Sequence, residues 1–192
     1  MMRAPSETSA AEQPLEKHEI IRRDSAAYRE LHRKIHETVV HRDESREANQ
    51  VWRAACEAFH SFESPMFEVF TESGQALLKT GDGGMVDWAI AYLEVDPFHF
   101  RSGYDKSLLV RRLKWLVLLP EHQERLRVVV LRALDNPRRA AGYYSRLAAS
   151  LQSPEFLEHI RWRLQSSDPE IRRCAQRLLN YCEAFNRTTH HG

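Results

Sequence analysis

Helix-breaking residues recur at regular intervals along the second half of this 192-residue chain. Each breaker includes a proline placed where a helix would begin, and stretches of roughly 12 to 17 residues lie between them. The breakers are Pro120, Asn136-Pro137, Ser153-Pro154 and Asp168-Pro169. Apolar residues in these stretches recur at every third or fourth position, and no window of the chain alternates with the period of two that a strand needs. The pattern predicts an all-α fold.

The segment 19–62 contains neither proline nor glycine, and its apolar residues also keep helical spacing. A polar gap at residues 41–50 interrupts this spacing, with Asp43 and Ser45 as capping candidates for a second helix. One long bent helix is the alternative. The gap favours a helical hairpin that turns near residue 43.

The segment 64–119 is expected to hold the middle helices. Ser64-Pro65 supplies a cap and a first-turn proline for the first of them, and Asp105 supplies a cap for the last. We expect helices at 66–80, 85–95 and 105–119, with a glycine-rich stop at 81–84 and a loop at 96–104.

The two ends of the chain lack this periodicity. Residues 1–18 are polar and contain two prolines, and residues 186–192 are similar, so we expect a disordered N-terminal arm and a short tail. With a hydrophobic fraction of 42%, the remainder is long enough to bury one core, and we expect a single all-helical domain at 19–185. Its expected parts are the hairpin at 19–62, the middle helices at 64–119 and helix pairs at 120–185.

Two aspartate-containing turns are separated by the length of one two-helix repeat. Asp135 and Asp168 lie 33 residues apart, each between two expected helices. Helix pairs of this period bury their apolar faces by stacking on a neighbouring pair. The clearest such pair is 153–185. The inner face of its first helix is expected to carry Leu157, Ile160 and Leu164.

The segment 153–185 resembles a HEAT repeat. Its Asp168-Pro169 turn leads into Ile171-Arg172 and Cys174-Ala175, where that family usually has Val-Arg and Ala-Ala. By this resemblance, Asp168 caps the second helix and Arg172 reaches a neighbouring turn. Residues 120–151 keep the aspartate-containing turn of the repeat. The segment before them matches the repeat only in its layout of helices and turns. The resemblance implies a short, irregular α-solenoid of stacked antiparallel helix pairs, an architecture that serves recognition more than catalysis.

Charge divides the chain into two halves. Residues 1–100 carry 11 Lys and Arg against 18 Asp and Glu, whereas residues 101–192 carry 17 against 9. The overall net charge of +1 therefore conceals halves of −7 and +8. Of the 17 cations, 15 are Arg, which forms bidentate pairs with carboxylates and phosphates. The positive net charge of the second half indicates an acidic partner.

Two sets of residues are candidate contacts for that partner. The loop at 96–105 gathers three aromatic rings, a histidine and an arginine, and loops on rigid scaffolds often carry binding residues. We expect Phe98 and Phe100 to fill the core, and the exposed contacts of the loop to be His99, Arg101 and Tyr104. The second set consists of arginines that helix stacking would align into a stripe. The candidate contacts among them are Arg111, Arg112, Arg138, Arg139, Arg146, Arg172, Arg173 and Arg177.

The sequence contains no motif typical of an enzyme. A nucleophile elbow, a zincin motif, paired catalytic carboxylates and a dinucleotide fingerprint are all absent, and the run at 79–84 has the wrong order for a phosphate-binding loop. The pairs His32/His36 and Cys56/His60 have metal-ligand spacing. Their offset of about six residues, or ~9 Å along the expected hairpin, prevents all four from meeting at one ion. We therefore expect neither catalysis, nor a metal, nor a small-molecule cofactor.

The cysteines and the apolar runs indicate a cytoplasmic protein outside membranes. The chain has three cysteines, and Cys174 and Cys182 are eight residues apart along one expected helix, too far to form a disulfide. The first residues contain no apolar run typical of a signal peptide, and no later run reaches the roughly 20 residues that a membrane span needs.

Three functions fit these features. The leading hypothesis is a non-catalytic binding module, an adaptor or neutralising partner, whose Arg-rich C-terminal surface binds an acidic protein. The alternative is nucleic-acid binding through the same arginines, including a resemblance to HEAT-like DNA glycosylases, for which the nominated residues are Asp87, Trp88 and Trp115. In the third hypothesis the acidic N-terminal helices pack on the basic C-terminal ones and the chain neutralises itself.

Overall fold

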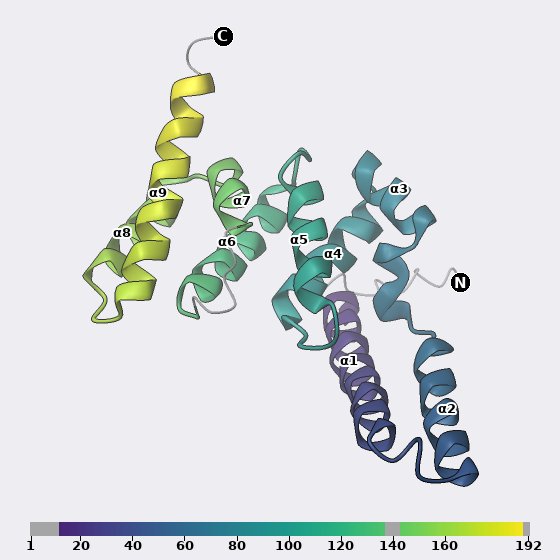
Figure 1. Cartoon of the computed structure of the whole chain (residues 1–192). Coiled ribbons are helices and arrows are strands. Elements are labelled where there is room, and N and C mark those ends of the chain that lie inside the picture. The colour runs from purple at the N-terminus through teal and green to yellow at the C-terminus, as the bar shows by residue number, and fades with distance from the viewer. Residues whose placement is uncertain (1–11, 137–142, 190–192) are drawn as a thin grey trace, which may run out of the picture. The chain divides into compact units, whose positions relative to one another are not determined.

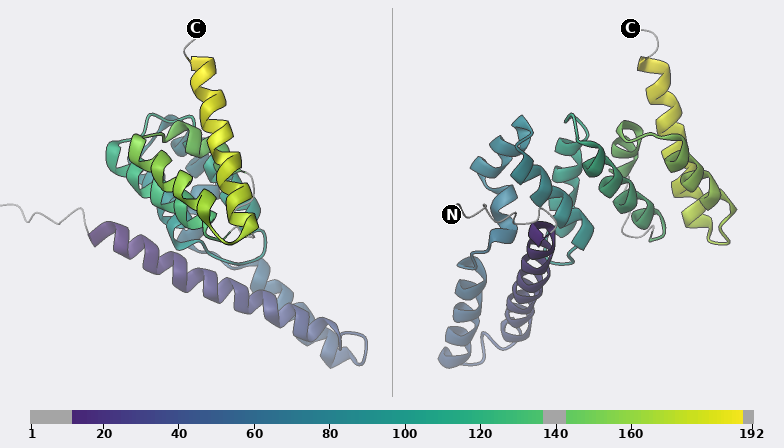
Figure 2. Two further views of the ribbon diagram at one scale, coloured as in Figure 1. Left: turned by 90° about the vertical axis from the view of Figure 1, so that its left-hand side faces the viewer. Right: turned by 180° about the vertical axis from the view of Figure 1, so that it is seen from behind.

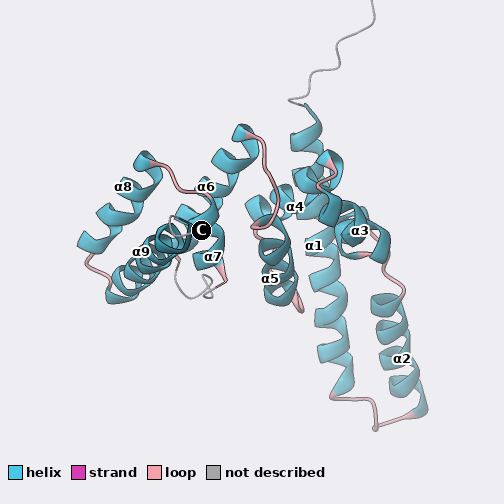
Figure 3. Ribbon diagram, turned by 90° about the horizontal axis from the view of Figure 1, so that it is seen from above, coloured by secondary structure: helices cyan, strands magenta, loops and turns pink. Residues whose placement is uncertain are grey.

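The computed structural model describes residues 12–136 and 143–189. These residues form helices joined by turns and contain no strand (Figure 3), which confirms the all-α expectation for the described part of the chain. The expected helix start at Asn136-Pro137 lies largely outside the described residues. Within the described residues, no helix is both long enough and apolar enough to span a membrane.

The structure divides into two compact units. The single domain expected at 19–185 stays a prediction. Unit 1 contains the residues up to Ala76 and residues 87–103, and unit 2 contains residues 77–86 and those from Tyr104 onward. The chain passes between the units inside three helices. These are α3 (Glu72–Thr80), α4 (Gly83–Val95) and α5 (Ser102–Leu113). Because helical periodicity continues across each boundary, no linker composition marks the division.

The first two helices of unit 1 form the expected hairpin (Figure 1). The ring of Tyr28 on the first helix stacks on that of Phe59 on the second, with centroids 4.5 Å apart. The Ser45 hydroxyl caps the second helix by accepting a hydrogen bond from the Ala48 amide at 3.0 Å. The two helices are α1 (Glu12–Val39) and α2 (Arg46–His60).

The helix expected at 66–80 is broken in two. A 3-10 helix (Pro65–Phe70) precedes α3, and Thr71 between them has an extended backbone. The Thr71 hydroxyl accepts a hydrogen bond from the Gly74 amide at 3.0 Å, so it caps α3. A Cβ atom on Gly74 would overlap the Glu68 carbonyl oxygen. Glycine is therefore required where the start of α3 meets the end of the 3-10 helix.

Helix α4 provides much of the core of unit 1, because five consecutive residues on it have no exposed surface. These are Ala89, Ile90, Ala91, Tyr92 and Leu93. These five residues cover every face of the middle of α4, and all are apolar or aromatic, as a helical segment buried all round requires. The preceding stop is shorter than the expected 81–84: Gly81 ends α3 with a φ of +79°, and the Asp82 carboxylate accepts a hydrogen bond from the Met85 amide at 3.0 Å.

Helix α5 is shifted toward the N-terminus relative to its expected position. It begins at Ser102, so Asp105 lies within the first turn and does not precede the helix as a cap. It ends at Leu113, because the chain turns where the Leu116 amide donates to the Leu113 carbonyl at 3.1 Å. The next helices of unit 2 are α6 (Pro120–Leu134) and α7 (Tyr144–Ser150).

The last two α-helices pack side by side, and α7 packs against the second of them, as both views of Figure 2 show. Buried Phe156 and Ile160 attach the first of the pair to the core. Leu157 and Leu164, expected on the inner face, are only half-buried. The pair consists of α8 (Pro154–Trp162) and α9 (Pro169–Thr189), separated by a short 3-10 turn (Arg163–Gln165).

The turn before α9 has the hydrogen bonds expected of its sequence. The Asp168 carboxylate accepts from the Glu170 amide at 2.8 Å and so caps α9. The Arg172 guanidinium donates to the carbonyls of Ser166 and Ser167 at 2.6 and 3.0 Å. Arg172 thus reaches the turn immediately before its own helix.

Both ends of the described chain are more helical than their composition indicates. Helix α1 already begins at Glu12, inside the segment expected to be a disordered arm. Helix α9 continues to Thr189, past the expected end of the domain. One cause is local, because the Asn186 side-chain amide donates a hydrogen bond to the Gln152 side-chain oxygen at 3.0 Å and ties this part of α9 to the residues after α7.

Candidate binding site

His99 was expected to be an exposed contact, and that expectation is wrong. Its side chain is 7% exposed, and its Nδ1 lies 2.8 Å from the Phe100 carbonyl, which can only accept a hydrogen bond. In the neutral ring Nδ1 therefore carries the proton, and Nε2 accepts from the Tyr92 hydroxyl at 2.7 Å. The histidine is buried because both ring nitrogens have partners inside unit 1.

The two phenylalanines of the same loop were expected in the core, and they are exposed. Phe98 and Phe100 are 66% and 51% exposed. The backbone explains the reversal, because Asp96 and Arg101 adopt the left-handed conformation at φ of 51° and 69° and turn the chain so that the histidine between the rings points inward. Phe100 still stacks on His32, with ring centroids 5.0 Å apart.

The other two loop candidates, Arg101 and Tyr104, are exposed as expected. They belong to different units, because unit 1 ends its second segment at Gly103. No arrangement of the pair as one contact surface follows from the structure, and their role in binding stays a prediction.

The predicted arginine stripe is exposed where the structure describes it. The exposed members are Arg111, Arg112, Arg146, Arg172, Arg173 and Arg177. Arg138 and Arg139 lie outside the described residues. Some members are engaged locally, since Arg172 holds the turn before α9 and Arg173 pairs with Glu170. Beside the stripe, Arg163 binds both carboxylate oxygens of Asp135 at 2.6 and 2.7 Å.

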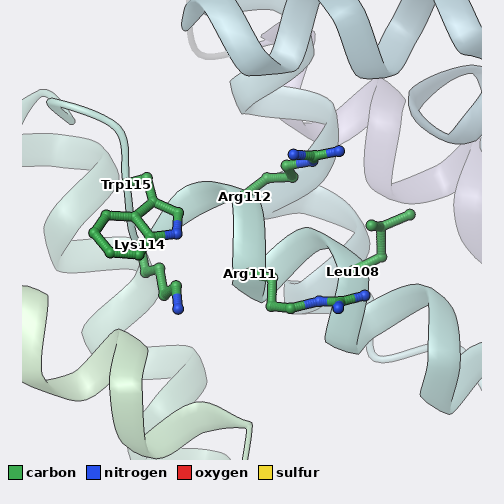
Figure 4. A pocket seen from close by; sticks show the side chains of 5 residues that line it. All are labelled: Leu108, Arg111, Arg112, Lys114 and Trp115. Atoms are coloured by element: carbon green, nitrogen blue, oxygen red, sulfur yellow. The ribbon is translucent and has the colours of Figure 1, made fainter.

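A cluster of cations surrounds a hollow at the C-terminal end of α5 in unit 2. The hollow has a volume of about 230 Å³. Figure 4 shows its three cationic side chains extending from the end of α5 and the following turn, with an indole ring beside them. Its lining residues are Leu108, Arg111, Arg112, Lys114 and Trp115. We call it the basic hollow.

A second hollow in unit 2, of about 260 Å³, shares Lys114 and Trp115 with the basic hollow. Its other walls are helices α7 and α9. Tyr181 and Phe185 supply two further exposed aromatic rings, and Arg146 supplies a further cation. The lining residues are Lys114, Trp115, Arg146, Ala149, Ser150, Tyr181, Ala184 and Phe185. We call it the aromatic hollow.

Lys114 lies where the two hollows meet, among like charges. Burial lowers the pKa of Lys114, and the positive charges of Arg146 and Arg111 lower it further. Its ammonium group lies 4.7 Å from the ring centroid of Trp115. Among the described residues, no carboxylate forms an ion pair with these three cations. Lys114, Arg111 and Arg146 therefore carry positive charge that no ion pair within the described part of unit 2 neutralises.

Sequence reasoning did not nominate Lys114, Tyr181 or Phe185, and it nominated Trp115 only for base excision. The sequence places Trp115 inside an expected helix, whereas in the structure it follows the helix end and is 79% exposed. Tyr181 and Phe185 are spaced one turn apart on α9, a pattern equally typical of a buried face. Only the packing of α7 and α9 shows that both rings border a hollow.

The structure brings no metal-binding group together among the described residues, and the residues nominated for base excision fall in two different units. The rings of His32 and His36 are 4.6 Å apart, but no group of three or more His, Cys, Asp or Glu that could hold a metal ion occurs among the described residues. Asp87, nominated as a catalytic carboxylate, pairs with Lys17 at 3.6 Å in unit 1, whereas Trp115 belongs to unit 2.

No protein-family model, curated protein or solved structure matches the chain. What the candidate site can do therefore follows from its own chemistry. Clustered cations beside exposed aromatic rings can bind an anionic group and an apolar group at the same time.

Proposed function

We propose that this chain is a non-catalytic helical binding module that binds an acidic protein through the basic and aromatic hollows of unit 2. In this proposal the helix pairs of unit 2 act as a short HEAT-like solenoid that presents the hollows to the partner. The chain acts as an adaptor or a neutralising partner in the cytoplasm, where its free cysteines, Cys56, Cys174 and Cys182, stay reduced.

The observation that carries the proposal is the group of Arg111, Lys114 and Arg146 around one exposed indole ring. Like charges held close together repel one another, and a bound carboxylate relieves that repulsion. Arginine adds bidentate hydrogen bonds to the charge attraction. A carboxylate of a partner therefore gains more binding free energy here than at an arginine that already has an acidic neighbour.

Nucleic acid is the second candidate, and the exposed ring of Trp115 beside Lys114 favours it. Proteins that bind single strands combine cations with aromatic rings on which bases stack. A strand also needs cations along its length. In unit 2, Arg127, Arg163 and Arg173 are paired with Glu124, Asp135 and Glu170. This local pairing interrupts a continuous track and supports a short acidic protein segment instead.

The test compares polyglutamate with a single-stranded oligothymidine as ligands of the full chain, with binding followed by fluorescence anisotropy. We expect polyglutamate to bind with an affinity that falls as salt is added. The double charge reversal, Lys114→Glu with Arg146→Glu, is expected to reduce the affinity for polyglutamate about tenfold or more, because both attractions become repulsions. Arg161→Glu, an exposed cation on α8 outside both hollows, is the matched control and should have a much smaller effect.

The double variant changes the net charge by four and the control by two. A loss of binding free energy in the double variant that is no more than about twice the loss in the control would show that net charge alone governs binding and would refute a localised site. Binding of oligothymidine that exceeds that of polyglutamate at the same salt concentration would replace the acidic protein with nucleic acid as the partner.

A further inference from the structure

We propose that the aromatic hollow is an anchor site for one large apolar side chain, carried by an acidic segment of the partner protein. This inference rests on the proposed function and adds what the partner must present besides negative charge. The occupant is a protein segment in which a residue such as Phe or Leu is flanked by Asp or Glu.

The walls of the hollow are apolar and come from three parts of unit 2. On α9, Tyr181, Ala184 and Phe185 follow the spacing of one helix face. On α7, Ala149 contributes a small side chain, which leaves space between the larger rings. The third wall is Trp115, from the turn after α5. Large rings around small residues form a concavity of the kind that receives a single side chain in protein interfaces.

The exposure of these rings indicates that the hollow is incomplete without an occupant. Trp115, Tyr181 and Phe185 are 79%, 41% and 44% exposed, although each borders the same space. A contiguous apolar patch rimmed by polar side chains commonly marks an interaction site. Covering the rings removes apolar surface from water, which is the principal favourable contribution of an anchor residue.

The charges at the rim determine which kind of segment fits. Lys114 and Arg146 line the aromatic hollow, and Lys114 also lines the basic hollow together with Arg111. An apolar side chain seated among the rings therefore has cations beside it on the same surface. Carboxylates adjacent to the anchor residue complement these cations, whereas Lys or Arg in those positions would be repelled.

A nucleobase is a poorer occupant than a hydrocarbon side chain. Apart from the two cations, the polar side chains of the lining are the Ser150 hydroxyl, the Tyr181 hydroxyl and the Trp115 indole nitrogen. A base that enters deeply must bury several donors and acceptors on its edge, and those without partners destabilise the complex. An aliphatic or phenyl side chain has no such groups, so the chemistry of the lining favours a protein segment.

The experiment measures the affinity of the full chain for two short peptides of Glu and Asp, one with a central Phe and one with Ala in its place. We expect the Phe peptide to bind about tenfold more tightly, the gain from burying one large apolar side chain. Phe185→Ala removes a wall and Ala184→Gln fills the space, and both should abolish this preference while retaining binding of the Ala peptide. Trp162→Ala, which truncates an exposed ring outside both hollows, should leave the preference unchanged.

The outcomes distinguish a failure of the anchor-site proposal from a failure of the proposed function on which it rests. Equal affinity of the two peptides would overturn the anchor site and leave the acidic-partner function standing. Failure of both peptides to bind would overturn the function and the anchor together. A preference for Phe that survives both Phe185→Ala and Ala184→Gln, in variants whose circular dichroism matches the parent chain, would place the anchor elsewhere and overturn this assignment. Tighter binding of oligothymidine than of either peptide would assign the surface to nucleic acid.

Discussion

Replacing Asp24 with asparagine should weaken the junction between α1 and the 3-10 helix of unit 1. The Asp24 carboxylate is only 6% exposed and accepts two hydrogen bonds, from the Ser64 hydroxyl at 2.5 Å and from Arg23 Nε at 2.7 Å. The same Ser64 oxygen accepts a hydrogen bond from the Met66 amide at 2.9 Å. One buried carboxylate therefore orients the hydroxyl that caps the next element, and Asp24→Asn removes its charge with little change of shape.

The size of the effect follows from the partners of the carboxylate. Burial acts to raise the pKa of Asp24, but hydrogen bonds from Arg23 and Ser64 outweigh it and leave the pKa below its ordinary value of 3.8. A hydrogen bond to a charged group contributes about 1.5–3 kcal/mol, so Asp24→Asn should destabilise unit 1 by about 1–3 kcal/mol. Arg23 is largely exposed, so Arg23→Ala should have a much smaller effect than Asp24→Asn.

The assay is urea unfolding followed by far-ultraviolet circular dichroism, with amide hydrogen exchange to localise the loss to residues 60–70. Because the folded pKa of Asp24 is lowered, its contribution is complete above the unfolded value of 3.8 and disappears as the pH falls through the lower folded value. The difference between the parent chain and Asp24→Asn should therefore shrink below about pH 4. Equal stability at neutral pH, or a difference that stays constant through this range, would refute the role assigned to the ionised carboxylate.

Two further predictions concern packing and thiol chemistry. Gly74→Ala should destabilise unit 1 by about 1–3 kcal/mol because its Cβ overlaps the Glu68 carbonyl oxygen, whereas Gly103→Ala, which has open space, should be neutral or stabilising in the same unfolding assay. Burial, with a smaller effect of Glu183, raises the pKa of the Cys182 thiol to about 11, so iodoacetamide at neutral pH should label half-buried Cys56 before Cys182. Peptide mass spectrometry reads the order of labelling, and early modification of Cys182 in the folded chain would contradict the burial argument.

The elements that could be predicted are those whose signals are local. Ser45, Ser64, Ser153 and Asp168 each form the capping hydrogen bond that their position before a helix indicates. The break at Thr71 could not be predicted in the same way. It depends on the approach of the Glu68 carbonyl to Gly74, which exists only once the 3-10 helix has formed. The division into two units could not be predicted from the sequence either, because its boundaries fall inside helices.

The candidate site was predictable in its charge and not in its place. An excess of Arg in the second half is a property of composition, and it indicates the sign of a partner without locating it. The loop at 96–105 shows the limit most clearly. Its two phenylalanines were expected in the core and its histidine at the surface, but in the structure the Tyr92 hydroxyl donates to buried His99 and both phenylalanines are exposed. A buried polar residue with a distant partner leaves no periodic signal in the sequence.

The proposed place of binding follows instead from the positions of cations that have no carboxylate partner among the described residues. An arginine already paired with a carboxylate, as Arg163 is with Asp135, must give up that partner to bind another, so the exchange yields little free energy. Lys114 has the opposite surroundings, because burial and the charges of Arg146 and Arg111 all disfavour its protonated form. A bound carboxylate acts against these effects and raises the pKa of Lys114 again, so binding should take up protons at alkaline pH. Of the excess positive charge in the second half, the part at the end of α5 should therefore attract a carboxylate most strongly, and the exposed rings of the aromatic hollow lie beside it.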